Sequence, residues 1–169
     1  MLLGIPVLKQ ERMMQIREAR AEEAERCWAI RNQAIRHGCR SSYSEAVITA
    51  WTPAQMPASY RQTILDHPFF VAVDPQDCPV ATGFLVPASG SVEAIFTLPA
   101  WSGRGAGGLI IAAIVREARR RGLSQLTLSS TPNAQRFYQR HGFSVVRYAD
   151  YNSTLAQARL RCVEMRLTL

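Results

Sequence analysis

The chain has 169 residues, of which 47% are apolar and 20% are charged, and its formal net charge is +7. A chain of this length and composition can bury one apolar core without disulfides or metals, which excludes a disordered chain. It lacks the run of roughly 20 apolar residues that a membrane-spanning helix needs, which excludes a membrane span. The positive charge favours an anionic partner but does not distinguish a phosphorylated cofactor from nucleic acid.

The N-terminal segment carries no periodic pattern. We expect residues 1–12 to be a ragged extension ahead of one domain that spans residues 13–169. The segment also lacks the basic stretch and the small-residue cleavage site of a signal peptide, so we expect a cytoplasmic protein with no membrane partner. The four cysteines and three histidines are scattered, with no C-x-x-C pair, and we expect free thiols and no metal site.

The first predicted elements are a strand and three helices. Residues 14–19 alternate weakly between apolar and polar side chains, as a strand does. Residues 21–36 place apolar side chains along one helical stripe that is broken only at Arg31. Ser44 has the position of an N-cap for a second short helix, and a third helical piece is expected at about 57–66.

Beyond residue 68 the sequence favours strands. Segments 69–73, 79–87 and 91–98 are rich in β-branched and aromatic residues, and short turns such as DPQDC separate them. Strands joined by such short connections pair as antiparallel neighbours, so the three segments predict a meander.

A glycine-rich run, WSGRGAGGLI, follows the meander and opens an amphipathic helix that Gly122 is placed to end. The rest of the pattern predicts a strand, a short helix and two closing strands, at 125–130, 131–141, 143–148 and 162–169. This order of elements predicts an α+β fold with a mixed, largely antiparallel central sheet flanked by helices.

The glycine run is typical of a phosphate-binding turn, because a backbone without side chains comes close to a phosphate and the first N–H groups of the next helix point at it. Its spacing also fits a dinucleotide fingerprint, but that needs an Asp or Glu about 20 residues later. Residues 118–149 contain six arginines and no acid, and no Gly-Lys-Ser/Thr of a P-loop follows. A segment with many arginines and no acid suits the anionic phosphates of coenzyme A. The alternative is that the glycines only allow close packing of helix and strand.

Two segments resemble motifs of the GNAT superfamily of N-acetyltransferases. TLPAWSGRGAGGLIIAAI resembles its motif A, and NAQRFYQRHGF resembles the motif that follows it. The resemblance runs from residue 14 to the end and implies a GNAT fold, acetyl-CoA as cofactor and a primary amine as acceptor. It implies cofactor contacts from twelve residues: Phe96, Thr97, Leu98, Ser102, Gly103, Arg104, Gly105, Ala106, Gly107, Gly108, Asn133 and Phe137.

Ser102 departs from motif A, where Gln or Arg is usual at this position. A serine is too short to support the phosphate loop in the same way, so weaker or rearranged contact with the diphosphate is expected. Arg104 is the candidate to compensate from within the loop, and the alternative is that it points into water.

The resemblance implies direct attack of the amine in a ternary complex. A lysine-like amine must first lose a proton, which costs about 4.6 kcal/mol at pH 7 for a reference pKa near 10.4. Glu93, expected to share a strand face with Ile95 and Thr97, is the candidate base, and ordered water is the alternative. Tyr138 is the candidate acid for the departing thiolate, and the alternative is a core aromatic packed beside Phe137.

Two other functions stay open. The first is a coenzyme A-binding domain of the same fold with weakened catalysis, which Ser102 favours. The second, nucleic-acid binding, has only the net charge in its favour and no recognisable motif, so no nucleic-acid partner is expected. The resemblance places acceptor specificity at about 33–60 and in a loop at 150–160, with Tyr43 and Trp51 as candidate lining residues and helix packing as the alternative for Trp51. The acceptor is left open, as is the oligomeric state, for which a homodimer is one possibility.

Overall fold

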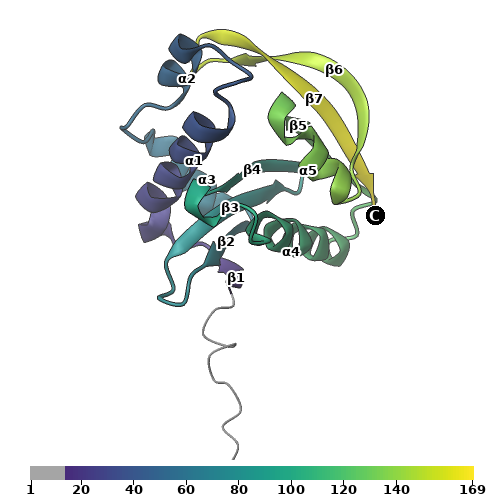
Figure 1. Cartoon of the computed structure of the whole chain (residues 1–169). Coiled ribbons are helices and arrows are strands. Elements are labelled where there is room, and N and C mark those ends of the chain that lie inside the picture. Colours follow the sequence, from purple (N-terminus) through teal and green to yellow (C-terminus); the bar gives the residue numbers. More distant parts are fainter. Residues whose placement is uncertain (1–13) are drawn as a thin grey trace, which may run out of the picture.

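The computed structural model describes residues 14–169, so the expected extension at 1–12 lies outside the described residues. One seven-stranded sheet has the strand order β1-β2-β3-β4-β5-β7-β6, and within the described residues only β4 and β5 pair in parallel (Figure 1). The strands are β1 (Gln15–Glu18), β2 (Phe69–Val73), β3 (Pro79–Val86), β4 (Ser91–Thr97), β5 (Gln125–Ser130), β6 (Ser144–Ser153) and β7 (Ala158–Thr168). The mixed α+β sheet predicted from the sequence is confirmed.

In the part of the chain that the structure describes, five α-helices flank the sheet: α1 (Ala24–Gly38), α2 (Glu45–Trp51), α3 (Ala58–Asp66), α4 (Ala106–Arg120) and α5 (Gln135–Arg140). Two signals predicted from local chemistry are confirmed at their ends. The side chain of Ser44 accepts the N–H of Val47 at 3.2 Å and caps α2. Gly122 has a φ of 76° just after α4, where the left-handed region favours glycine. Within residues 14–169, every helix is too short or too polar to cross a membrane.

The two closing strands are longer than the sequence predicts. They form a hairpin that arches over α5 toward α2, and its turn lies at 154–157 (Figure 1). The loop expected at 150–160 is therefore wrong, because most of it is paired strand. Most residues of β6 are exposed, so no apolar alternation marks its second half, whereas β7 carries the buried apolar residues Leu160, Cys162 and Met165 between polar ones. Cross-strand ion pairs such as Arg147–Glu164 and Arg159–Asp150 accompany the backbone pairing.

A β-bulge interrupts β4. Phe96 pairs with Thr82 and Glu93 pairs with Phe84, so β4 has one extra residue between them, and Ala94 has a φ of 55°. The bulge puts Glu93 on the sheet face of Phe84, which packs against the cluster that contains residues of α1. The expectation that Glu93 shares a face with Ile95 and Thr97 is wrong, because regular alternation fails at the bulge.

The opposite face of the sheet packs on α4, and Gly83 of β3 sets how closely. A Cβ at Gly83 would lie 2.5 Å from Cδ1 of Ile95 and also against Ile110 of α4. Ile110 and Ile114 are fully buried in the largest core cluster, between α4 and the sheet. Glycine at position 83 thus brings α4 close to the bulge of β4, which fixes the start of α4 near the end of that strand.

Candidate active site

The parallel strands β4 and β5 part immediately. Their register contains one pair, Ser91 with Thr127, after which β4 runs to the bulge and β5 runs away from it. A cavity of about 440 Å³, which we call the β4–β5 cavity, opens between them. A second cavity of about 460 Å³, the α4–α5 cavity, lies over the starts of both helices. The two adjoin, because five residues line both: Ile95, Thr97, Ser102, Ala134 and Tyr138.

The glycine run lines the α4–α5 cavity with Gly103 and with residues 105–108, whose N–H groups are free of hydrogen bonds within residues 14–169. The first helical hydrogen bond of α4 is donated by the N–H of Leu109 to the oxygen of Gly105 at 3.1 Å. Among the described residues, the N–H groups of residues 103–108 have no acceptor. Such unpaired N–H groups at the positive end of a helix dipole form an anion-binding site.

The four glycines of this run divide into two pairs. Gly103 and Gly105 have φ values of 75° and 86°, and nothing lies within 4 Å of a Cβ placed on them, so they shape the turn and keep it open. A Cβ on Gly107 would lie 2.7 Å from Cζ of Phe137, and one on Gly108 would lie 2.9 Å from Cε1 of His141. Close packing therefore explains the second pair, and its partner is α5 rather than a strand.

Ser102 and Arg104 do not act together in the structure. Ser102 lines both cavities, but the guanidinium of Arg104 stands 4.7 Å over the ring of Trp101 and does not line the α4–α5 cavity. Arg104 therefore makes a cation–π contact with Trp101 and does not support the phosphate loop in place of Ser102, contrary to the expectation. The cation at this cavity is Arg140, which the sequence indicated only as one of six arginines in an acid-free interval.

The three residues expected to contact the cofactor from the end of β4 have different places. Leu98 lines neither cavity and its N–H donates to the oxygen of Val80 at 2.9 Å, so the prediction for Leu98 is not supported. Because alternate residues direct their N–H groups to opposite sides of a strand, the N–H of Thr97 points to the side from which β5 has departed. Thr97 lines both cavities and Phe96 lines the β4–β5 cavity.

Tyr138 lies on α5 where the two cavities adjoin. Its ring makes edge contacts with Phe137 and Phe143 at centroid distances of 5.1 and 5.8 Å, and the residue is 8% exposed. The hydroxyl has no hydrogen-bond partner among residues 14–169 and is not sealed from the cavity. Burial, and secondarily the charge of Glu93, raise the pKa of the Tyr138 phenol well above its usual range. The phenol therefore keeps its proton at neutral pH.

Glu93 reaches the β4–β5 cavity from the other face of the sheet. Its side chain is exposed and accepts a hydrogen bond from Oγ of Ser91 at 2.6 Å. Tyr138 lines the same cavity, and the charge of Glu93 contributes to the raised pKa of its phenol. The structure thus brings the candidate base and the candidate acid to one cavity.

The remaining predicted residues lie on the walls. Asn133 lines the β4–β5 cavity, and its Oδ1 accepts a hydrogen bond from Oγ of Ser42 at 3.3 Å, while Phe137 lines the α4–α5 cavity. Tyr43 and Trp51 both line the β4–β5 cavity, with their rings edge to face at 5.7 Å. Their role in lining an acceptor site stays a prediction.

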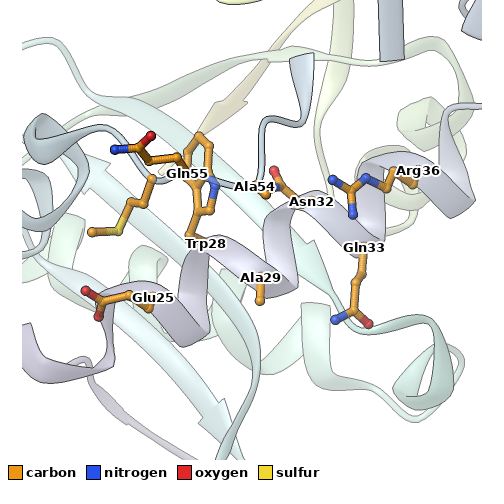
Figure 2. A pocket seen from close by; sticks show the side chains of 9 residues that line it. Glu25, Trp28, Ala29, Asn32, Gln33, Arg36, Ala54 and Gln55 are labelled. Atoms are coloured by element: carbon orange, nitrogen blue, oxygen red, sulfur yellow. The ribbon is translucent and has the colours of Figure 1, made fainter. Parts of the chain in front are cut away.

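Another cavity, of about 510 Å³, lies on the far side of α1 and has no candidate catalytic residue on its walls (Figure 2). The side chains of Trp28 and Asn32 reach it, but each donates a hydrogen bond to the oxygen of Pro53 at 2.9 Å. Arg36, also in this view, donates to the side chain and the backbone oxygen of Thr52. Its polar groups hold the segment after α2 in place, so the reactive centre is to be sought at the β4–β5 cavity.

A helix start with unpaired N–H groups, placed beside the split between β4 and β5, is typical of proteins that bind a phosphate-carrying ligand. The model of the acetyltransferase (GNAT) domain matches residues 39–169. The chain therefore belongs to the GNAT acetyltransferase family.

Solved structures share the fold. A GCN5-related N-acetyltransferase from Rhodopseudomonas palustris is 22% identical with a TM-score of 0.84, over 93% of this chain and 96% of the other. The PaiA N-acetyltransferase from Thermoplasma acidophilum, solved with coenzyme A, is 16% identical with a TM-score of 0.75, over 93% and 99%. A phosphinothricin acetyltransferase from Sinorhizobium meliloti, solved with acetyl-CoA, is 17% identical with a TM-score of 0.70, over 92% and 88%. No match was found among curated protein sequences.

Proposed function

We propose that this protein transfers the acetyl group of acetyl-CoA to a primary amine, by direct attack in a ternary complex. The observation that carries the proposal is the set of N–H groups at Gly103 and at residues 105–108, which are unpaired among the described residues and lie at a cavity that Tyr138 also lines. Two of the structural neighbours are solved with coenzyme A or acetyl-CoA, which supports the same cofactor here.

The residues at the α4–α5 cavity fit a coenzyme A diphosphate. The open turn at Gly103 and Gly105 leaves room for phosphate oxygens beside the backbone, and Arg140 adds a cation at the same cavity. Burial and the nearby charge of Arg140 lower the pKa of His141, so the histidine in this wall is neutral at neutral pH. The N–H groups and Arg140 would therefore hold the diphosphate.

When bound, acetyl-CoA supplies an acetyl group already activated as a thioester. The N–H of Thr97, free of β5, would polarise the thioester carbonyl by donating a hydrogen bond to it. Glu93 would accept the proton of the amine, directly or through water, and the protonated hydroxyl of Tyr138 would donate to the leaving sulfur. This arrangement assigns base and acid to different elements, β4 and α5.

The test has a binding arm and a turnover arm. Acetyl-CoA at a hundredfold excess over its Kd should stabilise the protein by about 2.7 kcal/mol, read as a rise in Tm, and NADH should not. A panel of amines is then mixed with acetyl-CoA, and free coenzyme A and acetylated amine are measured by mass spectrometry. Absence of any acetyl-CoA effect on Tm and in calorimetry would overturn the proposal.

A second candidate is a coenzyme A-binding domain with weakened catalysis. The observation that favours it is the pair of Ser102 at the usual Gln or Arg position and Arg104 stacked on Trp101, which leaves the loop without side-chain support from within. A cofactor-dependent rise in Tm without acetylation of any amine in the panel would select this candidate.

A further inference from the structure

The β4–β5 cavity carries one side chain of each charge. Of the 22 described residues that line it, Arg31 is the only Lys or Arg and Glu93 is the only Asp or Glu. The two do not pair with each other, because the ion pairs of the described residues include neither of them. Both charges are therefore available to a ligand that fills the cavity.

Arg31 is a buried cation with spare hydrogen-bonding capacity. It is 8% exposed, and its guanidinium lies 4.4 Å over the ring of Trp28 and 5.7 Å from that of Trp51. Its Nη1 donates to Oδ1 of Asn32 and to the backbone oxygen of Trp51, both at 2.8 Å. Its Nε and Nη2 have no acceptor within residues 14–169. Neither atom is fully buried, because the Tyr60 hydroxyl is the only fully buried side-chain polar atom without a partner among these residues. The free donors thus open on the cavity.

A buried guanidinium without an ion-pair partner costs free energy unless a negatively charged group binds it. Burial lowers the pKa of Arg31 to about 10, which leaves the group charged at neutral pH. The planar fork of an arginine binds a carboxylate through two parallel N–H bonds. The two stacked tryptophan rings hold this fork in one orientation, so the site is built before a ligand arrives.

We infer that the acceptor is a small zwitterion, a primary amine that also carries a carboxylate, with the carboxylate bound by Arg31 and the amine directed to Glu93. The inference rests on the proposed acetyl transfer and specifies its substrate class. A lysine side chain within a protein or a peptide N-terminus carries no carboxylate beside the amine and would leave Arg31 unpaired. Tyr43, Trp51 and Tyr151 line the same cavity and provide apolar surface for the rest of such a molecule.

The experiment compares each amino acid with its own methyl ester. Phenylalanine, methionine and alanine are tested against the corresponding esters, which keep the amine and the side chain but remove the negative charge. An ester lowers the pKa of its amine and so favours the chemical step, which means that a preference for the acid must come from binding. We expect KM for the acids to be about 10- to 100-fold lower than for the esters, as one charge-assisted hydrogen-bonded pair gives. Equal KM values, or lower values for the esters, would overturn the inference.

Variants of Arg31 separate binding from folding. Arg31→Lys keeps the charge and loses the fork, and Arg31→Gln loses both. We expect both to raise KM for the acids about tenfold or more, with KM for the esters and for acetyl-CoA unchanged. Arg36→Gln is the matched control, because Arg36 also lies on α1 and holds the end of α2, but it lines the other cavity (Figure 2). A parallel rise for acids and esters in Arg31→Lys would show that Arg31 only holds α2, and would overturn the inference.

A third arm does not depend on turnover. N-acetylphenylalanine, which has the carboxylate but no free amine, should bind the wild type and the Arg36→Gln protein with equal affinity in the presence of coenzyme A, and should bind Arg31→Gln about tenfold or more weakly. Calorimetry measures this binding and also the binding of coenzyme A, so an Arg31 variant that does not fold is recognised because it no longer binds coenzyme A. If Arg31→Gln does not fold, the binding of N-acetylphenylalanine to Arg31→Lys tests the inference instead. Failure of the proposed function would appear as absent coenzyme A binding in the wild type, whereas failure of this inference would leave that binding and ester acetylation intact.

Discussion

Replacement of Tyr138 by phenylalanine separates a catalytic hydroxyl from a core aromatic. The ring contacts with Phe137 and Phe143 are kept in Tyr138→Phe, and no hydrogen bond is lost, because the hydroxyl has no partner among the described residues. We therefore expect the free energy of unfolding to change by less than about 1 kcal/mol. Loss of a general acid lowers turnover by about 10²- to 10⁴-fold, which corresponds to about 2.7–5.4 kcal/mol at 1.36 kcal/mol for each tenfold step. Stability and catalysis should thus separate by several kcal/mol.

The assay measures kcat from released coenzyme A, Tm by calorimetry and the Kd of acetyl-CoA on the same preparations. Tyr148→Phe is the matched control, since Tyr148 is 69% exposed, bonds Gln135 and lines neither cavity. We expect it to leave kcat unchanged. A Tyr138→Phe enzyme with the kcat of the wild type would refute the acid assignment, and a large fall in Tm would show that the hydroxyl serves the fold.

Three further predictions concern the turn, the base and the core. Gly107→Ala places a Cβ against the ring of Phe137, so we expect the free energy of unfolding to fall by about 1–3 kcal/mol, partly offset by the helix propensity of alanine, and kcat to fall as well. In Gly103→Ala the new Cβ meets no atom but the residue is strained at φ 75°, so this variant should mainly raise the KM for acetyl-CoA. The reverse pattern would contradict the packing argument. Glu93→Gln should lower kcat/KM at pH 7 and regain much of it as the pH approaches the pKa of the amine, whereas a pH-independent loss would argue against a base. Burial raises the pKa of Tyr60, whose hydroxyl is buried and unpaired among the described residues, so above about pH 10 the unfolded chain releases this proton first. Tyr60 alone should then lower the free energy of unfolding by up to about 1.4 kcal/mol per pH unit. Tyr60→Phe should remove this part of the slope and raise Tm at pH 7, as alkaline unfolding curves would show.

Elements governed by local chemistry could be predicted from the sequence. Strand β2 lies at the predicted residues 69–73, because β-branched and aromatic side chains between strong turn signals leave few alternatives. The cap at Ser44 and the end of α4 at Gly122 depend on single side chains and a single backbone conformation. The turn at the glycine run could be predicted for the same reason, since a glycine-rich turn that enters a helix leaves the first N–H groups of the helix free.

Features that depend on partners distant in sequence could not be predicted. The bulge at Ala94 has no glycine or asparagine to announce its positive φ, and it follows from the register with β3. Arg31 interrupts an apolar stripe in the sequence, and only the approach of Trp51 from α2 shows that it is buried between two rings. Likewise, the N–H of Leu98 is taken by Val80 of a neighbouring strand, which no pattern within residues 91–98 reveals.

The bulge explains how one split in the sheet can serve two substrates. Regular alternation would place Glu93 on the α4 face together with Thr97, beside the N–H groups that are proposed to hold a diphosphate, where a carboxylate would repel it. Because of the extra residue at Ala94, Glu93 instead shares the α1 face with Phe96, near the side from which Arg31 reaches the cavity. Thr97 and Tyr138 line both cavities, so they stand where the proposed thioester and the proposed amine meet. The proposed phosphate and the proposed zwitterionic acceptor would thereby be directed to opposite faces of one strand, and the carboxylate of Glu93 would stay beside the amine.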